Sequence, residues 1–274
     1  MPHRRAFTVI EFIATIVILA VVLAWVLTLM ANLPRRYSFQ MQDQTQVRGI
    51  IQGMINHSPG NNEWYPGLTA QGQEDTAPLT PELDRPLPPE GIPSDARLNR
   101  FGTHARGGFD PAYRFAFLIR NQYITPEYLV GTSEQDLSIQ PATDGTMLDR
   151  RHFSFAMLRI DEPNTGRRGE WRSTTNSRAP VVTDRNRAGA GEAPRSNWSP
   201  ANAEWRGVVG YNDNHVNFET THVIADTLYE RKDGEGFAHV KADNLLADDN
   251  DTRGRAGHDA GMVYQDEKTY VNQK

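Results

Sequence analysis

Apolar residues are concentrated in one block near the start of the chain, and the remaining sequence is mostly polar. From Phe12 to Leu29 the only polar side chains are Thr15 and Thr28, whose hydroxyls can bond back to a carbonyl of the preceding helical turn. Apolar residues would lie on every face of this helix, which favours burial in lipid. A helix over residues 7–30 would span roughly 36 Å, enough to cross a hydrocarbon core of about 30 Å.

A second helical pattern runs from Tyr37 to about Asn56. Apolar residues recur in it at spacings of three and four, namely Met41, Val47, Ile50, Ile51, Met54 and Ile55. The residues expected to face solvent are Gln42, Asp43, Gln46, Arg48 and Gln52. Gly49 and Gly53 lower the helix propensity but permit close packing. The pattern predicts a helix that is buried along one side.

Prolines and glycines predict where these helices are interrupted and where they end. Pro34 has no amide hydrogen, so we expect a kink or break near Asn32 and Leu33. The run His57-Ser58-Pro59-Gly60 predicts the end of the second helix. Residues 59–111 are rich in Pro, Gly and Asp, and they predict a long irregular segment that is either an ordered surface loop or partly disordered.

The remaining residues predict a head that contains strands. The segments with strand character are 152–160, 207–218, 262–264 and 269–271. The strongest of them predicts two short strands around a turn, where Asp213 and Asn214 tolerate a left-handed backbone. Residues 112–119 fit either a helix or a strand, and residues 167–177 are predicted to form a polar loop. We therefore predict an α+β fold, with a long N-terminal hydrophobic helix, an antiparallel β-sheet head and long irregular loops.

Charge and cysteine content exclude several classes of function. The 274 residues carry a formal net charge of -5 and no basic stripe. Binding of nucleic acid requires clustered Lys and Arg that neutralise phosphates, so we predict no nucleic-acid partner. The chain has no cysteine, which excludes disulfides, thiolate metal sites and cysteine nucleophiles.

The sequence contains no pattern typical of a catalytic or metal site. Five scattered histidines show no metal-ligand spacing, namely His152, His215, His222, His239 and His258. No Gly-x-Ser-x-Gly nucleophile motif is found. The acidic run 243–251 holds oxygen ligands suited to calcium, but no bidentate Glu closes it, which favours a solvated acidic loop. We predict no catalytic residue, no metal and no cofactor, and hence a protein that is not an enzyme.

One carboxylate, Glu11, stands at the start of the apolar block. An ionisable residue inside a membrane segment is costly and usually has a partner. It belongs to the stretch Arg4-Arg5-Ala6-Phe7-Thr8-Val9-Ile10-Glu11-Phe12. This stretch resembles the N-terminal cleavage and methylation site of type IV pilins and type II secretion pseudopilins, with Ala6 where that family usually has Gly.

The resemblance implies processing followed by assembly. Prepilin peptidase would cut between Ala6 and Phe7 and methylate Phe7. Glu11 would become the fifth residue of the mature chain, and in that family this residue pairs with the terminal amine of a neighbouring subunit. The implied partners are the peptidase, other pilin or pseudopilin subunits and the inner membrane. The implied function is that of a structural subunit in a type IV pilus-like or type II secretion pseudopilus filament.

The implied organisation follows the same resemblance. Residues 1–6 would be a leader peptide, residues 7–57 a pilin-like helix with 7–31 in the membrane, and residues 58–274 a periplasmic or extracellular head. We expect one pass through the inner membrane with a cytoplasmic N-terminus, followed by a place in the pilus or pseudopilus.

Two further stretches resemble pilin-like proteins of the planctomycete type. The first is Asn61-Asn62-Glu63-Trp64-Tyr65-Pro66, which is similar to the loop that follows their helix. The second combines residues 181–186 with 207–218 and resembles their C-terminal hairpin region, with Asn214 where Gly is usual.

Two other interpretations of the apolar block compete with this one. A single-pass anchor on a periplasmic binding or interaction protein that does not assemble explains everything except Glu11. His3, Arg4 and Arg5 favour a cytoplasmic N-terminus for it, although Arg35 and Arg36 weaken that asymmetry. A cleaved secretory signal is disfavoured because the block is long and no small-x-small cleavage site follows it.

Overall fold

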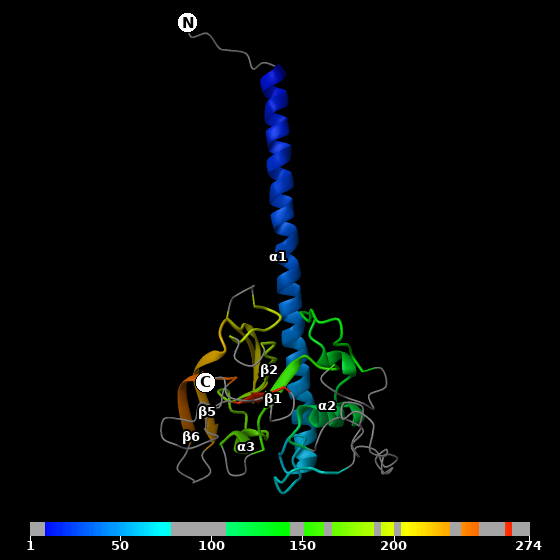
Figure 1. Cartoon of the computed structure of the whole chain (residues 1–274), viewed down its shortest axis with the longest axis vertical. Helices are drawn as coiled ribbons and strands as arrows, with labels where there is room; N and C mark the ends of the chain where they lie inside the picture. The colour runs from blue at the N-terminus through cyan, green and yellow to red at the C-terminus, as the bar shows by residue number, and fades with distance from the viewer. Residues whose placement is uncertain are drawn as a thin grey trace. The chain divides into compact units, whose positions relative to one another are not determined.

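The computed structural model describes residues 9–77, 108–142, 151–161, 166–188, 193–199, 204–230, 237–246 and 261–264. The chain divides into two compact units, Met1–Met41 and Gln42–Lys274. Helices and antiparallel strands are both present, which confirms the α+β class. The ribbon with its element labels is drawn in Figure 1.

Helix α1, Val9–His57, continues through Pro34. The prediction near Asn32 and Leu33 was a kink or a break, and the continuous helix shows that there is no break. Proline fixes φ close to the helical value and removes one hydrogen bond, and the long runs of helix on both sides keep their own bonds. The predicted end is confirmed, because α1 ends at His57 and a short 3-10 helix, η1, follows at Ser58–Asn61.

The last part of α1, residues 42–57, belongs to the second compact unit. The head was predicted to begin at residue 58. The buried apolar side chains of this part of α1 are Val47, Ile50, Ile51 and Met54. Met41, which was predicted on the buried face, is 64% exposed. Asp43, which was predicted to face solvent, is fully buried. The head therefore covers α1 from Asp43 onward, and it does so with polar as well as apolar groups.

Glycines let other segments approach this part of α1 closely. A Cβ on Gly49 would collide with the ring of Tyr128. A Cβ on Gly53 would lie 2.9 Å from Cγ2 of Ile124. The expectation that Gly49 and Gly53 permit close packing is thus confirmed.

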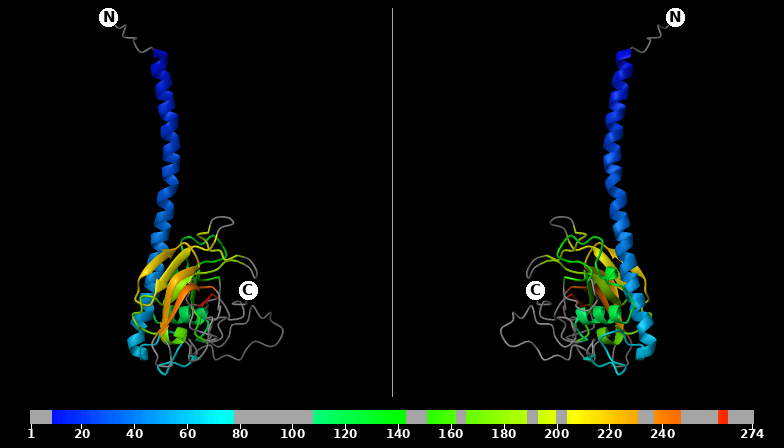
Figure 2. Two further views of the ribbon diagram at one scale, coloured as in Figure 1. Left: turned by 90° about the vertical axis from the view of Figure 1, so that its left-hand side faces the viewer. Right: turned by 90° about the vertical axis from the view of Figure 1, so that its right-hand side faces the viewer.

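The head contains a five-stranded sheet with the order β4-β3-β2-β1-β7, and each neighbouring pair is antiparallel. Its strands are β1 (Phe155–Leu158), β2 (Pro180–Asp184), β3 (Gly207–Tyr211), β4 (Val216–Glu219) and β7 (Met262–Val263). In both views of Figure 2 the green and yellow strands run beside the last turns of α1.

Strands β3 and β4 form the hairpin that was predicted within 207–218. Asn214 in its turn has a φ of 68°, the left-handed conformation expected there. The side chain of Asn214 also donates to Oε1 of Gln52 at 3.0 Å, which ties the turn to α1. Strand β7 confirms the strand character of residues 262–264, whereas residues 269–271 lie outside the described part of the chain.

Residues 112–119, which fitted either type of element, are helical. Helix α2 spans Pro111–Arg120, with Pro111 in its first turn and Asp110 as its N-cap. The carboxylate of Asp110 accepts a hydrogen bond from Ala112 N at 2.9 Å, which stabilises the helix start. A 3-10 helix, η4, follows at Pro126–Leu129.

Two features of the head were not predicted. A second, two-stranded sheet is formed by β5 (Val223–Glu230) and β6 (Phe237–Asn244). The short helix α3, Gly166–Glu170, occupies the start of the predicted polar loop. Arg167 and Glu170 of α3 are buried, although both are charged. Glu170 Oε1 accepts a hydrogen bond from Asn176 Nδ2 at 2.9 Å.

Candidate functional site

The described part of the chain contains one helical segment that is long and apolar enough to cross a membrane. It is Val9–Thr28, 20 residues with a mean hydropathy of 2.8. None of it is buried within the structure, and its large side chains are widely exposed. Twenty residues of helix rise about 30 Å, close to the thickness of a hydrocarbon core.

Hydroxyl groups in this segment bond to the helix backbone, as predicted. Thr15 Oγ1 donates to the carbonyl oxygen of Glu11 at 2.7 Å, and Thr28 Oγ1 donates to that of Trp25 at 2.7 Å. Each hydroxyl therefore has an acceptor within the helix.

Glu11 lies in the first turn of α1 and is exposed. It is the one ionisable residue between Val9 and Thr28. A carboxylate near a helix N-terminus is stabilised by the unpaired amides there. Ala6 and Phe7, the predicted processing residues, lie outside the described residues.

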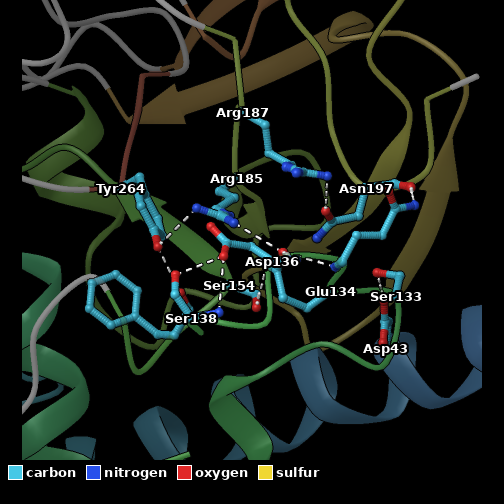
Figure 3. A network of polar contacts seen from close by, with 12 residues as sticks. Asp43, Ser133, Glu134, Asp136, Ser138, Ser154, Arg185, Arg187, Asn197 and Tyr264 are labelled. Atoms are coloured by element: carbon cyan, nitrogen blue, oxygen red, sulfur yellow. Dashed lines mark hydrogen bonds and ion pairs between the residues drawn. The ribbon is translucent and has the colours of Figure 1, made fainter. Parts of the chain in front are cut away.

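In the head, the side chain of Asp43 anchors α1 to the loop 131–138. Its Oδ1 accepts hydrogen bonds from Thr132 N at 2.6 Å and from Thr132 Oγ1 at 2.7 Å. Its Oδ2 accepts one from Ser133 Oγ at 2.6 Å. Figure 3 shows Asp43 beside Ser133 at the lower edge of a larger polar network.

Glu134 lies at the centre of that network. Arg185 Nη2 donates to its Oε1 at 3.0 Å, and Asp136 N donates to the same oxygen at 3.0 Å. Ser154 Oγ donates to its Oε2 at 2.9 Å. Glu134 and Arg185 form an ion pair with side chains 3% and 12% exposed, respectively.

Arg185 extends the network to the C-terminal strand. Its guanidinium lies 5.1 Å from the ring centre of Tyr264, and Nη1 donates to Tyr264 Oη at 3.3 Å. Tyr264 Oη in turn donates to the carbonyl of Phe153 at 2.9 Å. Residue 264, which follows β7, is thus tied to the start of β1 (Figure 3).

A third buried acid, Asp184, ends strand β2. It is 3% exposed, and its Oδ2 accepts a hydrogen bond from Val208 N of β3 at 2.7 Å. Burial and the nearby negative charges of Asp43 and Glu134 hold the pKa of Asp184 well above its usual value.

The other two acids have opposite shifts. Burial raises the pKa of Asp43, and its hydrogen bonds from Ser133 and Thr132 only partly oppose this effect. Burial also acts to raise the pKa of Glu134, but the Asp136 amide and the charge of Arg185 outweigh it, so that this pKa lies below its usual value.

The sequence did not single out these acids, although one signal was present. Asp43 is four residues before Val47 and seven before Ile50, so it occupies the buried face of α1. Nothing comparable marks Glu134 or Asp184, whose surroundings are set by contacts between distant segments.

Among the described residues, no group of three or more His, Cys, Asp or Glu side chains is placed to hold a metal ion. Asp243 of the acidic run is buried in β6 and accepts a hydrogen bond from Thr227 Oγ1. Residues 247–251 of that run lie outside the described part. His215 stacks on Tyr211 within the hairpin, with ring centres 4.1 Å apart.

Comparisons with family models, curated proteins and solved structures found no match to this chain.

Proposed function

We propose that the chain is a structural subunit of a type IV pilus-like or type II secretion pseudopilus filament. Residues 1–6 would act as a leader that prepilin peptidase removes between Ala6 and Phe7. Before assembly the segment Val9–Thr28 would hold the subunit in the inner membrane, with the N-terminus in the cytoplasm and the head in the periplasm. After assembly the same segment would lie among those of neighbouring subunits.

One observation carries the proposal. A 20-residue apolar helix with no burial inside its own chain has a single ionisable side chain, Glu11, in its first turn. A plain membrane anchor does not require a carboxylate at this position, and a charge in lipid is costly unless it is paired. A filament subunit can use it, because the amine of a newly exposed Phe7 on a neighbour would neutralise it and set the register between subunits.

The first test concerns processing. Mass spectrometry of the protein purified from its native membranes should find an N-terminus at Phe7 with one added methyl group. Substitution of Ala6 by Asp should leave the leader attached, because the peptidase is expected to need a small residue there. A wild-type protein that retains Met1 throughout would refute the processing step.

The second test concerns assembly. The Glu11→Ala variant should accumulate in the membrane at the wild-type level but fail to form filaments in immunogold images. Glu204→Ala, which removes an exposed carboxylate from the head, is the matched control and should assemble normally. Normal filaments from Glu11→Ala would favour the alternative, a single-pass anchored binding or interaction protein that does not assemble.

A further inference from the structure

The buried side chain of Asn212 has more hydrogen-bond acceptors around its nitrogen than an amide can serve. Nδ2 lies 2.7 Å from the carbonyl oxygen of Glu170 and 2.9 Å from that of Arg172. It also lies 2.8 Å from Thr174 Oγ1 and 3.2 Å from Glu170 Oε2. A neutral amide nitrogen carries two hydrogens, so four acceptors exceed its capacity. These surroundings are better suited to a nitrogen with a third hydrogen and a positive charge.

The oxygen of the same side chain meets a donor. Tyr65 Oη donates to Asn212 Oδ1 at 2.6 Å, and the two residues are 0% and 1% exposed, respectively. A hydroxyl aimed at a carbonyl oxygen in a site without water stabilises negative charge that develops on that oxygen. Tyr65 is therefore positioned as an oxyanion donor.

A hydroxyl and a base lie beside this amide. Thr174 Oγ1 donates to Oε2 of Glu170, which is fully buried. Asn176 Nδ2 donates to the other oxygen, Oε1, at 2.9 Å and fixes the direction of the carboxylate. A hydroxyl bonded to a base that a third group orients is the arrangement that activates Ser and Thr nucleophiles.

The geometry brings the Thr174 hydroxyl close to the acyl carbon of Asn212. Oγ1 lies 2.8 Å from Nδ2, and an amide C–N bond is about 1.3 Å long, so Oγ1 is within about 4.1 Å of Cγ. Attack requires a separation of about 3–3.5 Å, which a change in the Thr174 side-chain torsion supplies. The next residue, Thr175, has a φ of 57°, which a β-branched residue rarely adopts. The turn that presents the hydroxyl is thus held at a local cost in backbone energy.

We propose that Thr174 and Asn212 form an intramolecular ester crosslink after the head has folded. Oγ1 of Thr174 bonds to Cγ of Asn212, and its proton moves to Oε2 of Glu170. The tetrahedral intermediate carries negative charge on Oδ1, which Tyr65 stabilises. Glu170 then passes the proton to Nδ2, the C–N bond breaks and ammonia leaves. One hydroxyl and one carboxamide become one ester and one ammonia, and no oxidant or reductant is needed.

The four acceptors around Nδ2 assist this reaction. When Nδ2 is protonated in the intermediate, it carries three hydrogens and a positive charge, and it bonds to these acceptors more strongly than the amide does. Interactions that strengthen in the transition state accelerate a reaction. Burial of the site then protects the ester from water. The bond would join residues that are 38 apart in the chain, within the head, and it does not depend on how the apolar segment is used.

The test is peptide mass spectrometry of the full wild-type chain, purified in detergent. Trypsin cuts after Arg172, Arg178, Arg206 and Arg231, so the two reacting residues fall in the separate peptides 173–178 and 207–231. These peptides should be recovered as one species, with the sum of their masses less one ammonia. Mild hydroxylamine, which cleaves esters and leaves amides intact, should separate them.

Two results with the wild-type chain would overturn the proposal, and neither depends on the folding of a variant. The first is recovery of only the separate, unmodified peptides after long incubation at neutral pH. The second is loss of ammonia from peptide 207–231 alone, which would indicate a cyclic imide at Asn212 and not a crosslink.

Substitutions identify the nucleophile. Thr174→Ala should abolish the joined species, and Thr174→Ser, which keeps a hydroxyl, should retain it. Thr175→Ala is the matched control, since it removes the neighbouring, exposed hydroxyl, and it should form the crosslink as wild type does. A joined species in Thr174→Ala would refute the assignment.

Further variants test the roles of the base and the oxyanion donor. Crosslinking is followed over time in chain made by cell-free synthesis with detergent, and near-ultraviolet circular dichroism shows that each variant has folded. Glu170→Gln should not form the bond, because an amide cannot take the proton of Thr174. Tyr65→Phe should form it about 100-fold more slowly, as is usual when one oxyanion donor is lost. Formation at the wild-type rate in both variants would show that these groups do not take part, and the mechanism would be wrong.

Discussion

Gly210 of β3 lies against Ile51 of α1 with no room for a side chain between them. A Cβ on Gly210 would lie 2.5 Å from Cδ1 of Ile51 and 2.6 Å from Cγ1 of Val47. We expect Gly210→Ala to destabilise the head by about 2 kcal/mol, because the added methyl group must push α1 away from the sheet. Thermal unfolding of the two proteins at one pH would measure the difference.

Gly60 provides the control for this substitution. No heavy atom lies within 4 Å of the position that its Cβ would occupy. Gly60→Ala should therefore leave the Tm almost unchanged. An equal loss for both variants would show that the effect arises from the backbone and not from contact with α1.

The buried side chain of Asn212 joins segments that are far apart in the chain. It accepts a hydrogen bond from Tyr65 Oη at 2.6 Å and donates to the carbonyl oxygens of Glu170 at 2.7 Å and Arg172 at 2.9 Å. Asn212→Asp replaces the donor by a second acceptor, which would face those carbonyls. We expect a loss of about 3 kcal/mol, since buried acceptors would be left unpaired beside a new charge.

The exposed Asn217 of β4 permits the same chemical change without burial. Asn217→Asp should alter the free energy of unfolding by less than about 0.5 kcal/mol, as is usual for a surface position. Tyr65→Phe, which removes a single donor to Asn212, should fall between the two variants. Denaturant titration of all three would establish or refute this order.

The ion pair between Glu134 and Arg185 predicts a loss of stability in acid. Because the pKa of Glu134 is lowered by folding, its contribution is present above 4.5 and is lost as pH falls through the lowered value. Glu134→Gln should cost about 3 kcal/mol at neutral pH by leaving Arg185 without its charged partner. The difference from wild type should shrink as pH falls from 4.5 through the lowered pKa, below which wild-type Glu134 is also neutral. Glu204→Gln, on the surface, should follow the wild-type curve at each pH.

The segment Val9–Thr28 predicts how the chain partitions into membranes. Leu19, near its middle, is 68% exposed within the structure. Leu19→Arg should reduce the fraction that resists alkaline carbonate extraction, since a charge at the centre of a membrane helix costs about 3 kcal/mol. Met41→Arg, on an exposed position of α1 beyond the segment, should remain membrane-bound. Equal extraction of the two variants would contradict a membrane-spanning role.

Local patterns predicted the features that depend on neighbouring residues. The end of α1 at His57 follows from Ser58-Pro59-Gly60, which cannot continue a regular helix. The hairpin of β3 and β4 follows from two short apolar runs around Asn214, which adopts the left-handed conformation. In both cases the cause lies within a few residues of the effect.

The prediction for Asp43 failed because the cause lies elsewhere in the chain. Asp43 was assigned to the solvent face by its charge, but Thr132 and Ser133, about 90 residues away, supply the donors that allow its burial. Pro34 was expected to kink or break α1, and α1 continues through it without a break. Strands β5 and β6 were not predicted, although they are neighbours in the sequence and pair with each other.

The sequence by itself determined the apolar segment at the start of the chain, its single carboxylate Glu11 and the α+β character of the head. These properties depend on composition and on short-range periodicity. Only the tertiary structure decided that Asp43, Glu134 and Asp184 are buried and which donors each of them meets. Solvation and hydrogen bonding act between groups that are close in space, and the packing of α1, a loop and a sheet brings these donors to the acids.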